Sequence, residues 1–358
     1  MKKLVTVMLA LVMSMSLLLA GCGSSSESTE NTEEETEVED DGEETADDSE
    51  ETSEIVASDV KVALLLVGAI NDYGWSQAGY EGVSEAAEEY GFEFAYSESV
   101  ALAEMETTLR DYASQGYDLI IAHGDEFSDA VCTVAEEFPD CSFAISNGAP
   151  TTELDNVIGM DIRNEEQGYI AGYALGLLTE SGKVGFIGSV EGTSQKRVEN
   201  GLTQGLAASN PDAEVMISYV GSYSDMAAAK EQATAMIEQG ADVLFQYAQG
   251  AGIGVVQAAA EEGVKIVVTT PSQAEMAEGY AAFAVQTVNK DLVKMLIDSY
   301  MDGEFGPDLV IEGTFATNLF QINSIDNDVI SEEVMAEIQE QADALADGSL
   351  VLETRQLD

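Results

Sequence analysis

The sequence predicts an α/β fold of two lobes, each with a parallel sheet flanked by helices, joined by a hinge. From residue 59 onward, short apolar runs alternate with longer Ala- and Glu-rich stretches, as expected of βαβ units. The same order of runs occurs twice along the chain. Residues 113–120 are similar to 237–244, and residues 135–137 to 260–262, at offsets of 124 and 125 residues. Such long offsets indicate a duplicated lobe and not a solenoid of short repeats.

The first half of the folded region opens with a buried strand. Residues 62–67 are all apolar, and Gly68 ends the run. Helical spacing then stops at Gly91 and again at Gly116, because glycine readily adopts the left-handed conformation that ends a helix. The expected strands are 62–67, 92–96, 118–122 and 142–145, and the expected helices are 77–90, 105–115 and 130–138.

The second half repeats this alternation of apolar runs and helical spacing. Its expected strands are 183–187, 214–219, 243–246 and 265–269, and its expected helices are 195–209, 227–239 and 255–262.

The lobe boundaries follow from the repeat and from the C-terminal segments. Residues 291–301 and 329–346 have patterns that fit segments returning to complete the first lobe. The chain is expected to cross between the lobes near Asp161 and near Gln286. The expected bounds are 58–160 plus about 284–358 for the first lobe and 161–283 for the second.

Charge and composition exclude several classes of function. The chain has 358 residues, with 13 Lys and Arg against 68 Asp and Glu, and a formal net charge of −55. Such a field repels phosphate backbones, so we expect no nucleic-acid partner. With one histidine and three cysteines, the chain cannot build a His-rich or an all-cysteine zinc site. We expect no metal and no cofactor.

The N-terminus has the order of an export signal. Lys2 and Lys3 precede an apolar run, and Leu-Ala-Gly-Cys at 19–22 looks like a bacterial lipobox, in which Cys22 receives the lipid. We expect a signal peptide at 1–21 and an anchored protein on the extracytoplasmic face of the cell membrane. Residues 23–57 hold 16 carboxylates and no base, so residues 22–57 are expected to form a disordered tether.

Cys132 and Cys141 lie in the exported part of the chain, where a disulfide is permitted. A helix-to-strand geometry need not bring two sulfur atoms within bonding distance, so both the paired and the free state stay open.

The loops that follow the strands predict a ligand cleft between the lobes. The carboxyl ends of parallel strands gather at one edge of a sheet, and two such edges that face each other can enclose a small ligand. Trp75, the only tryptophan, lies in a loop with an amide and a carboxylate, a combination suited to stacking on a flat heterocycle and reading its edge. The candidate ligand-binding residues are Asn71, Asp72, Tyr73, Trp75, His123, Asn147, Asp161, Tyr223, Gln249, Gly250 and Thr270.

Structural roles for several of these residues stay open. Trp75 could pack beneath its loop, His123 could satisfy a backbone carbonyl, and Asp225 could simply cap the helix that follows it. The glycines of 250–254 lack the lysine of a phosphate-binding loop, and no Gly-x-Ser-x-Gly follows a strand. We therefore expect no catalytic residues and no enzyme.

Three segments together with the lipobox and tether resemble one family. Residues 71–82 read Asn-Asp-Tyr-Gly-Trp-Ser-Gln-Ala-Gly-Tyr-Glu-Gly, residues 163–172 read Arg-Asn-Glu-Glu-Gln-Gly-Tyr-Ile-Ala-Gly, and residues 239–246 read Gln-Gly-Ala-Asp-Val-Leu-Phe-Gln. They resemble the basic membrane protein family, the lipid-anchored substrate-binding proteins of ABC transporters that are related to the purine nucleoside receptor of spirochaetes. The resemblance covers residues 58–358.

This resemblance implies a type I periplasmic-binding-protein fold and an ABC permease as partner. It implies a purine nucleoside or nucleobase as ligand, and we expect a monomer. By position, Asn71 and Asp72 would contact the ligand, Trp75 and Tyr223 would flank its rings, and the loop at 250–254 would close on it.

One segment departs from the family pattern. Relatives that hold a ribose carry Gly-Val-Asp-Ser-Asp-Gln after the last strand of the second lobe, whereas residues 268–273 read Val-Thr-Thr-Pro-Ser-Gln. A lysine of the following helix also has no match at 284–288. Loss of the two carboxylates argues against a sugar held by paired aspartates and favours a free base or another small molecule. The alternatives are a receptor for a sugar or an autoinducer-like molecule and, in another class, a surface hydrolase.

Overall fold

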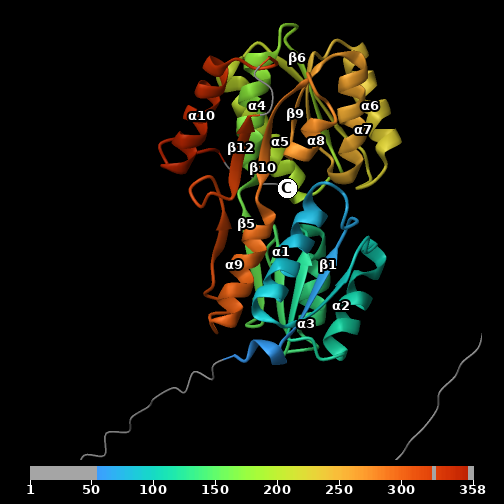
Figure 1. Ribbon diagram of the computed structural model, residues 1–358, viewed down its shortest axis with the longest axis vertical. Helices are drawn as coiled ribbons and strands as arrows, with labels where there is room; N and C mark the ends of the chain where they lie inside the picture. Colours follow the sequence, from blue (N-terminus) through green and yellow to red (C-terminus); the bar gives the residue numbers. More distant parts are fainter. Residues whose placement is uncertain (1–54, 325–327, 354–358) are drawn as a thin grey trace, which may run out of the picture. The chain divides into compact units, whose positions relative to one another are not determined.

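The structure is a computed structural model that describes residues 55–324 and 328–353 (Figure 1). The expected signal peptide, the lipidated Cys22 and residues 22–54 of the expected tether lie outside the described residues. Among the described helices, none combines the length and the apolar composition that a membrane-spanning segment needs.

The first lobe is built on a sheet in which every strand pair is parallel. Its strand order is β11-β5-β4-β3-β1-β2. Helix α9 lies against α1 on this lobe (Figure 1). The strands are β1 (Lys61–Leu66), β2 (Glu93–Ser97), β3 (Leu119–His123), β4 (Ser142–Ser146), β5 (Val157–Ile162) and β11 (Ile311–Gly313), and the helices are α1 (Trp75–Tyr90), α2 (Met105–Ser114), α3 (Ser128–Ala135) and α9 (Asn289–Met301).

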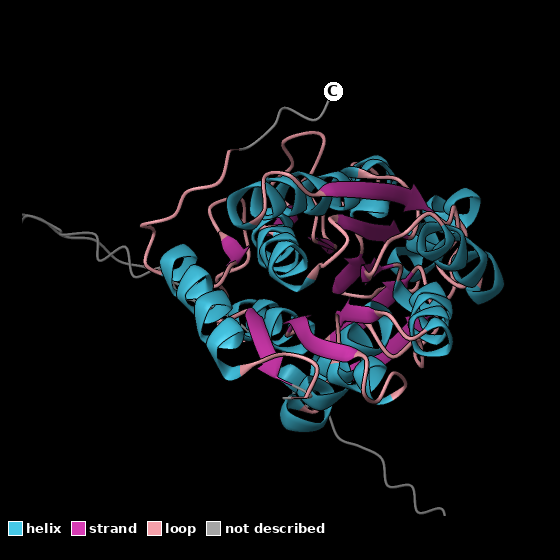
Figure 2. Cartoon of the chain, turned by 90° about the horizontal axis from the view of Figure 1, so that it is seen from above, coloured by secondary structure: helices cyan, strands magenta, loops and turns pink. Residues whose placement is uncertain are grey.

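The second lobe repeats this plan with the strand order β12-β10-β9-β8-β6-β7, in which only β12 runs antiparallel to its neighbour. Figure 2 shows strands lying between layers of helices, and the expected two-lobed α/β fold is confirmed. The strands are β6 (Lys183–Gly188), β7 (Glu214–Tyr219), β8 (Val243–Tyr247), β9 (Lys265–Val268), β10 (Ala281–Thr287) and β12 (Phe320–Ser324), and the helices are α4 (Asn164–Leu178), α5 (Thr193–Ser209), α6 (Met226–Glu238), α7 (Gly252–Glu262), α8 (Pro271–Glu275) and α10 (Glu332–Ala346).

The C-terminal lobe boundary differs from the expectation that 284–358 belongs to the first lobe. Strand β10 stays in the second sheet through Thr287, and β12 pairs with β10. The Tyr169 and Tyr173 hydroxyls of α4 donate to side chains of α10, at 3.1 Å and 2.9 Å, so α10 also covers the second lobe. Of the helices and strands described after residue 288, α9 and β11 return to the first lobe. The expectation failed because an apolar stripe on a helix does not specify which surface the helix will cover.

Helices α4 and α5 approach each other backbone to backbone. A Cβ atom placed on Gly168 or Gly172 of α4 would overlap the carbonyl oxygen of Val198 or Leu202 in α5. The reverse holds for Gly201, where a Cβ would overlap a carbonyl oxygen of α4. Only glycine permits this approach, which holds α4 and α5 in direct backbone contact.

The two described cysteines are free, so a Cys132–Cys141 disulfide is not formed. The Cys141 thiol donates to the Tyr117 carbonyl oxygen at 3.1 Å, while the Cys132 sulfur accepts from the backbone N–H of Thr151 at 3.3 Å. Each sulfur therefore serves a different backbone group. Burial raises the pKa of the Cys141 thiol to about 12, which keeps it protonated and unreactive.

Candidate functional site

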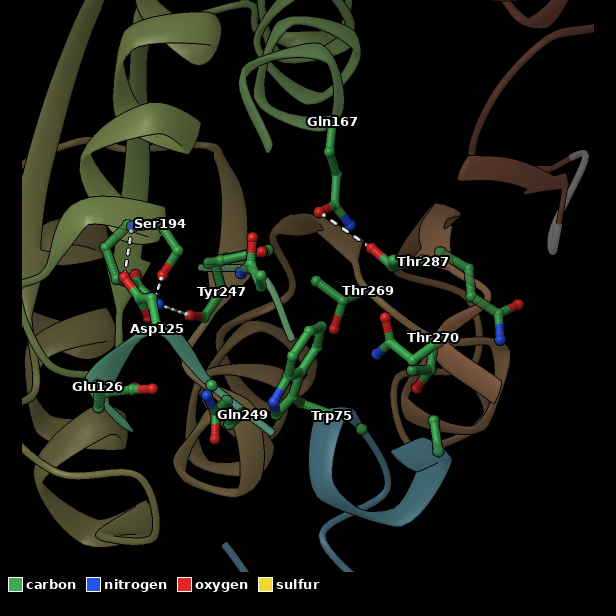
Figure 3. A pocket seen from close by; sticks show the side chains of 17 residues that line it. Trp75, Asp125, Glu126, Gln167, Ser194, Tyr247, Gln249, Thr269, Thr270 and Thr287 are labelled. Carbon is green, nitrogen blue, oxygen red and sulfur yellow. Dashed lines mark hydrogen bonds between the residues drawn. The ribbon is translucent and has the colours of Figure 1, made fainter. Parts of the chain in front are cut away.

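A pocket lies between the lobes, where strands of both sheets end (Figure 3). Its empty space, including the open mouth, is about 690 Å³. Three groups of residues line it. These are Gly74, Trp75, Ala78, Gly124, Asp125, Glu126 and Asn147 of the first lobe, Gln167, Ser194, Gln195, Tyr247, Gln249, Thr269 and Thr270 of the second, and Gln286, Thr287 and Asn289 at a chain crossing.

Trp75, the first residue of α1, is fixed in the pocket wall by His123. The two rings stack with centroids 4.1 Å apart and an interplanar angle of 14°. The indole Nε1–H donates to the His123 carbonyl oxygen at 3.1 Å, and the His123 ring Nε2 lies 3.1 Å from the Trp75 carbonyl oxygen. Figure 3 shows the indole among the pocket side chains. The ring is therefore a preoriented flat surface for a ligand.

His123 supports the tryptophan and does not line the pocket, contrary to its listing among the ligand-contacting candidates. It is fully buried, and burial lowers its pKa to about 4, so the ring is neutral at pH 7. Since Nε2 faces a carbonyl oxygen, the proton is assigned to Nε2. Gly79 provides the space, because a Cβ there would lie 2.6 Å from that nitrogen. Of the two open alternatives, the histidine satisfies a backbone carbonyl.

The loop before α1 contributes a helix cap where ligand contacts were expected. One oxygen of Asp72 accepts from the N–H of Gly74 at 2.9 Å, and the other accepts from the N–H of Ser76 at 3.0 Å. This carboxylate satisfies amides that the helix leaves without partners. Asn71 is exposed and Tyr73 is 45% exposed. None of Asn71, Asp72 and Tyr73 lines the pocket.

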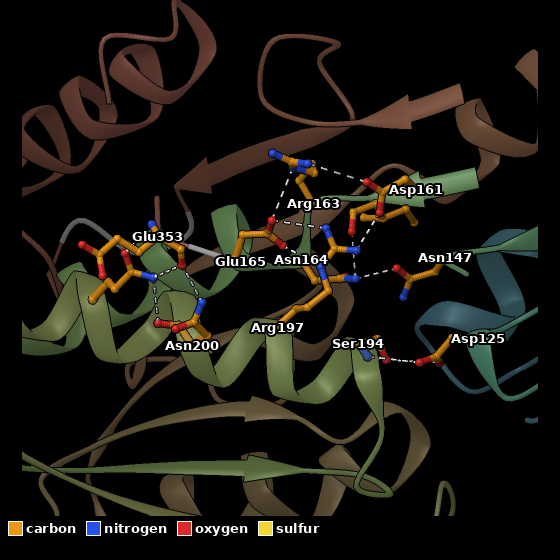
Figure 4. A network of polar contacts seen from close by, with 12 residues as sticks. Asp125, Asn147, Asp161, Arg163, Asn164, Glu165, Ser194, Arg197, Asn200 and Glu353 are labelled. Atoms are coloured by element: carbon orange, nitrogen blue, oxygen red, sulfur yellow. Dashed lines mark hydrogen bonds and ion pairs between the residues drawn. The ribbon is translucent and has the colours of Figure 1, made fainter. Parts of the chain in front are cut away.

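Asp161, Tyr223 and Gly250 also lie outside the pocket lining. The Arg197 guanidinium holds Asp161 at 2.6 Å beside the chain crossing (Figure 4). The Tyr223 hydroxyl donates to Glu126, and Gly250 packs against the Tyr223 carbonyl oxygen. These three positions hold the lobes and loops in place.

Trp75, Asn147, Gln249 and Thr270 do lie in the pocket wall, as their positions after strands led us to expect. Asn147 accepts from the Asn164 amide at 2.5 Å, which links the first lobe to the crossing into α4. Contact of these four residues with a ligand stays a prediction.

The rest of the polar lining lies outside the candidate ligand-binding residues, although Asp125 and Glu126 follow β3 and loops after strands were expected to form the cleft. It includes Gln195 and Asn289, each of which has a buried amide oxygen without a hydrogen-bond partner, as does Gln249. The lining also includes the carboxylates of Asp125 and Glu126 and contains no lysine or arginine. With two carboxylates and no cation in its lining, the pocket disfavours a ligand that carries negative charge.

Burial and the neighbouring Asp125 raise the pKa of Glu126 from 4.5 to about 7. Since the folded-state pKa lies above the unfolded one, protonated Glu126 contributes stability that is fully present below about pH 4.5 and is lost as the pH rises to about 7.

We expect Glu126→Gln to melt like the wild type at pH 4.5 and about 2–4 °C higher at pH 7.5, because it removes a charge that the protein buries. Thermal unfolding followed by circular dichroism across this pH range measures the difference. Glu88→Gln, at an exposed site, is the control. A constant difference between Glu126→Gln and the wild type at all pH values would contradict the expectation.

A family model described as ABC transporter substrate-binding protein PnrA-like, of the Bmp family, matches residues 59–342. The chain belongs to the Bmp family. This confirms the resemblance to basic membrane proteins, and it places the chain among the substrate-binding proteins of ABC transporters, which are membrane-associated, extracytoplasmic and not enzymes.

Curated Bmp relatives match much of the chain. A CD4+ T-cell-stimulating antigen of Listeria monocytogenes is 28% identical over 71% of this chain and 67% of that protein. The ABC transporter nucleoside-binding protein BmpA of Lactococcus lactis is 31% identical over 56% of this chain and 58% of that protein.

Among solved structures, an ABC transporter solute-binding protein from Conexibacter woesei is similar, with a TM-score of 0.64 and 25% identity. The match covers 82% of this chain and 98% of that one. The two-lobed architecture of this Bmp protein is therefore that of the solute-binding proteins.

Proposed function

We propose that this Bmp protein captures a purine nucleoside or nucleobase between its lobes and delivers it to an ABC permease. The observation that carries the proposal is the fixed indole of Trp75 in the pocket wall, stacked on His123 at 4.1 Å. A planar heterocycle gains stacking energy on such a ring without first ordering it.

The amide oxygens around the pocket supply the edge recognition. Gln195, Gln249 and Asn289 each present a buried oxygen that lacks a donor. Ring N–H groups, an exocyclic amine or sugar hydroxyls provide such donors. The two lining carboxylates and the lack of a lining cation disfavour the phosphate of a nucleotide.

The departure at 268–273 shapes the part of the pocket that would meet a ribose. Thr269 and Thr270 line it with hydroxyl groups, while Gln273 is buried and bonded to Gln246. Hydroxyls bind sugar oxygens less strongly than a charged carboxylate does. We therefore expect that removing the ribose costs this protein little affinity.

Calorimetric titration of the purified protein tests the proposal. Adenosine, guanosine, inosine, adenine and guanine are titrated in parallel, with adenosine monophosphate as the charged control. A panel of pentoses and hexoses tests the alternative that the ligand is a sugar. We expect binding of at least one purine nucleoside or base, and at least about 100-fold weaker binding of the monophosphate. Heat released with a sugar and none with any purine would replace the purine assignment by a sugar receptor.

We also propose that the protein is anchored through a lipid on Cys22, in view of the Leu-Ala-Gly-Cys string at 19–22. Labelling of bacterial cells with an alkyne-bearing palmitate analogue should mark the wild type and not Cys22→Ser. An unlabelled wild-type protein would remove the anchor from the proposal.

A further inference from the structure

Two adjacent carboxylates of the first lobe, Asp125 and Glu126, each accept a hydrogen bond from the second lobe. One Asp125 oxygen accepts from the backbone N–H of Ser194 at 3.0 Å, and the other accepts from the Ser194 hydroxyl at 3.2 Å. Glu126 accepts from the Tyr223 hydroxyl at 2.5 Å. Ser194 and Tyr223 belong to the second lobe, so both contacts cross the cleft.

Asp125 caps a helix that has no cap of its own. Ser194 lies in the first turn of α5, whose N-cap residue is Gly192 and which makes no side-chain capping bond within its own lobe. The first amides of a helix need outside acceptors, and a carboxylate there also meets the positive end of the helix dipole. The first lobe therefore supplies the side-chain cap of a helix in the second lobe. Figure 4 shows Asp125 beside Ser194 at this end of α5.

Tyr223 inserts its ring into the first lobe. The ring packs against the apolar cluster of that lobe that includes Leu65 and Phe127. Its backbone is held in the second lobe, where the Ala251 N–H donates to the Tyr223 carbonyl oxygen at 2.9 Å. Withdrawal of the second lobe would thus expose an apolar ring and break the bond to Glu126 at the same time.

The Asp161–Arg197 pair differs from these contacts in position. Asp161 lies at the end of β5, next to the point where the chain crosses into α4, and its 2.6 Å bond to Arg197 stays close to the hinge. Asp125, Glu126, Ser194 and Tyr223 lie on no crossing segment, so a hinge rotation separates them.

We propose that Asp125, Glu126, Ser194 and Tyr223 form a clasp that stabilises the closed protein and sets how long it stays closed. The clasp consists of protein–protein contacts alone, so it acts whether or not a ligand is present. Asp125 and Tyr223 are in this sense positioning residues. They hold the pocket walls together, while Trp75 and the amides recognise the ligand. The role of the clasp in transport rests on the proposed function.

The test compares four single variants of the full protein and one double variant. Asp125→Ala removes the cap across the cleft, and Tyr223→Phe removes the hydroxyl while keeping the ring. Asp225→Ala is the matched control, because Asp225 caps α6 within its own lobe by accepting from the Ala228 N–H at 3.0 Å. Asp125→Asn keeps one acceptor oxygen, so it should weaken the clasp less than Asp125→Ala does.

Small-angle scattering without any added solute is the first measurement. We expect a larger radius of gyration for the double variant Asp125→Ala/Tyr223→Phe than for the wild type and Asp225→Ala. Melting temperatures of the solute-free single variants should stay within about 2 °C of Asp225→Ala, since the contacts join lobes and not parts of one core. An unchanged radius of gyration would overturn the clasp.

The second measurement is stopped-flow with adenosine as the probe, followed by the fluorescence of Trp75, the only tryptophan. We expect Tyr223→Phe, which changes no residue of the pocket lining, to raise the dissociation rate about tenfold and to leave the association rate within about twofold, because the clasp exists only after closure. An unchanged dissociation rate, or an association rate that falls by as large a factor as the dissociation rate rises, would overturn the proposal. A wild type that does not respond to adenosine would refute that ligand and leave the scattering result to decide on the clasp.

Discussion

Replacing Gly201 by alanine is expected to lower the melting temperature by about 10 °C or to prevent folding of the second lobe. A Cβ at this position of α5 would overlap the carbonyl oxygen of Glu165 in α4, and backbone cannot move aside as a flexible side chain can. Forcing the helices apart costs about 3 kcal/mol or more, and each kcal/mol shifts the melting temperature of a domain of this size by about 2–4 °C. Differential scanning calorimetry measures the loss.

Gly306→Ala is the matched control, because no atom lies within 4 Å of where its Cβ would be. Melting of Gly201→Ala within 2 °C of Gly306→Ala would mean that the two helices are not in backbone contact.

Replacing Trp75 by alanine is expected to weaken binding of the proposed purine ligand by about 10- to 100-fold. Stacking of a base on an aromatic ring contributes about 1–3 kcal/mol in alanine substitutions. The change also uncovers His123, whose ring rests against the indole at 4.1 Å. Trp75→Phe should recover part of the affinity, since it keeps a flat ring at the same position. Calorimetry is the suitable measurement, because the variant has no tryptophan fluorescence.

Tyr73→Ala serves as the control, since this aromatic residue lies two positions away and is 45% exposed outside the pocket. We expect its affinity to equal that of the wild type. Equal losses for Tyr73→Ala and Trp75→Ala would place the ligand on the outer loop and not in the pocket.

The candidate site was predictable where it depends on the ends of strands. Asn147 follows β4 and Thr270 follows β9 by two residues, and both line the pocket because parallel strands bring such positions to one edge. Asp72 was assigned to the ligand, but its carboxylate accepts from the amides of Gly74 and Ser76 at the start of α1. The helix was expected to begin at residue 77, so nothing in the sequence analysis placed Asp72 at its start.

Other parts of the site carry no local signal. Gln286 and Asn289 line the pocket because β10 and α9 meet at a chain crossing. A crossing was expected near Gln286, but no local pattern indicated that these two side chains face the pocket. The sequence did show glycines four residues apart at 168, 172 and 176, but the pattern alone does not name the helix that packs on them.

Local sequence pattern was enough to establish a two-lobed α/β protein with Trp75 at the cleft, because strand and helix periodicities are written in neighbouring residues and parallel sheets gather their loops at one edge. Tertiary structure alone decided that β12 and α10 cover the second lobe, that His123 lies behind the tryptophan, and that Asp125 caps a helix of the opposite lobe. These outcomes depend on which surfaces meet across long stretches of chain. A hydrogen-bond donor or an apolar face looks the same in sequence whichever partner it finds.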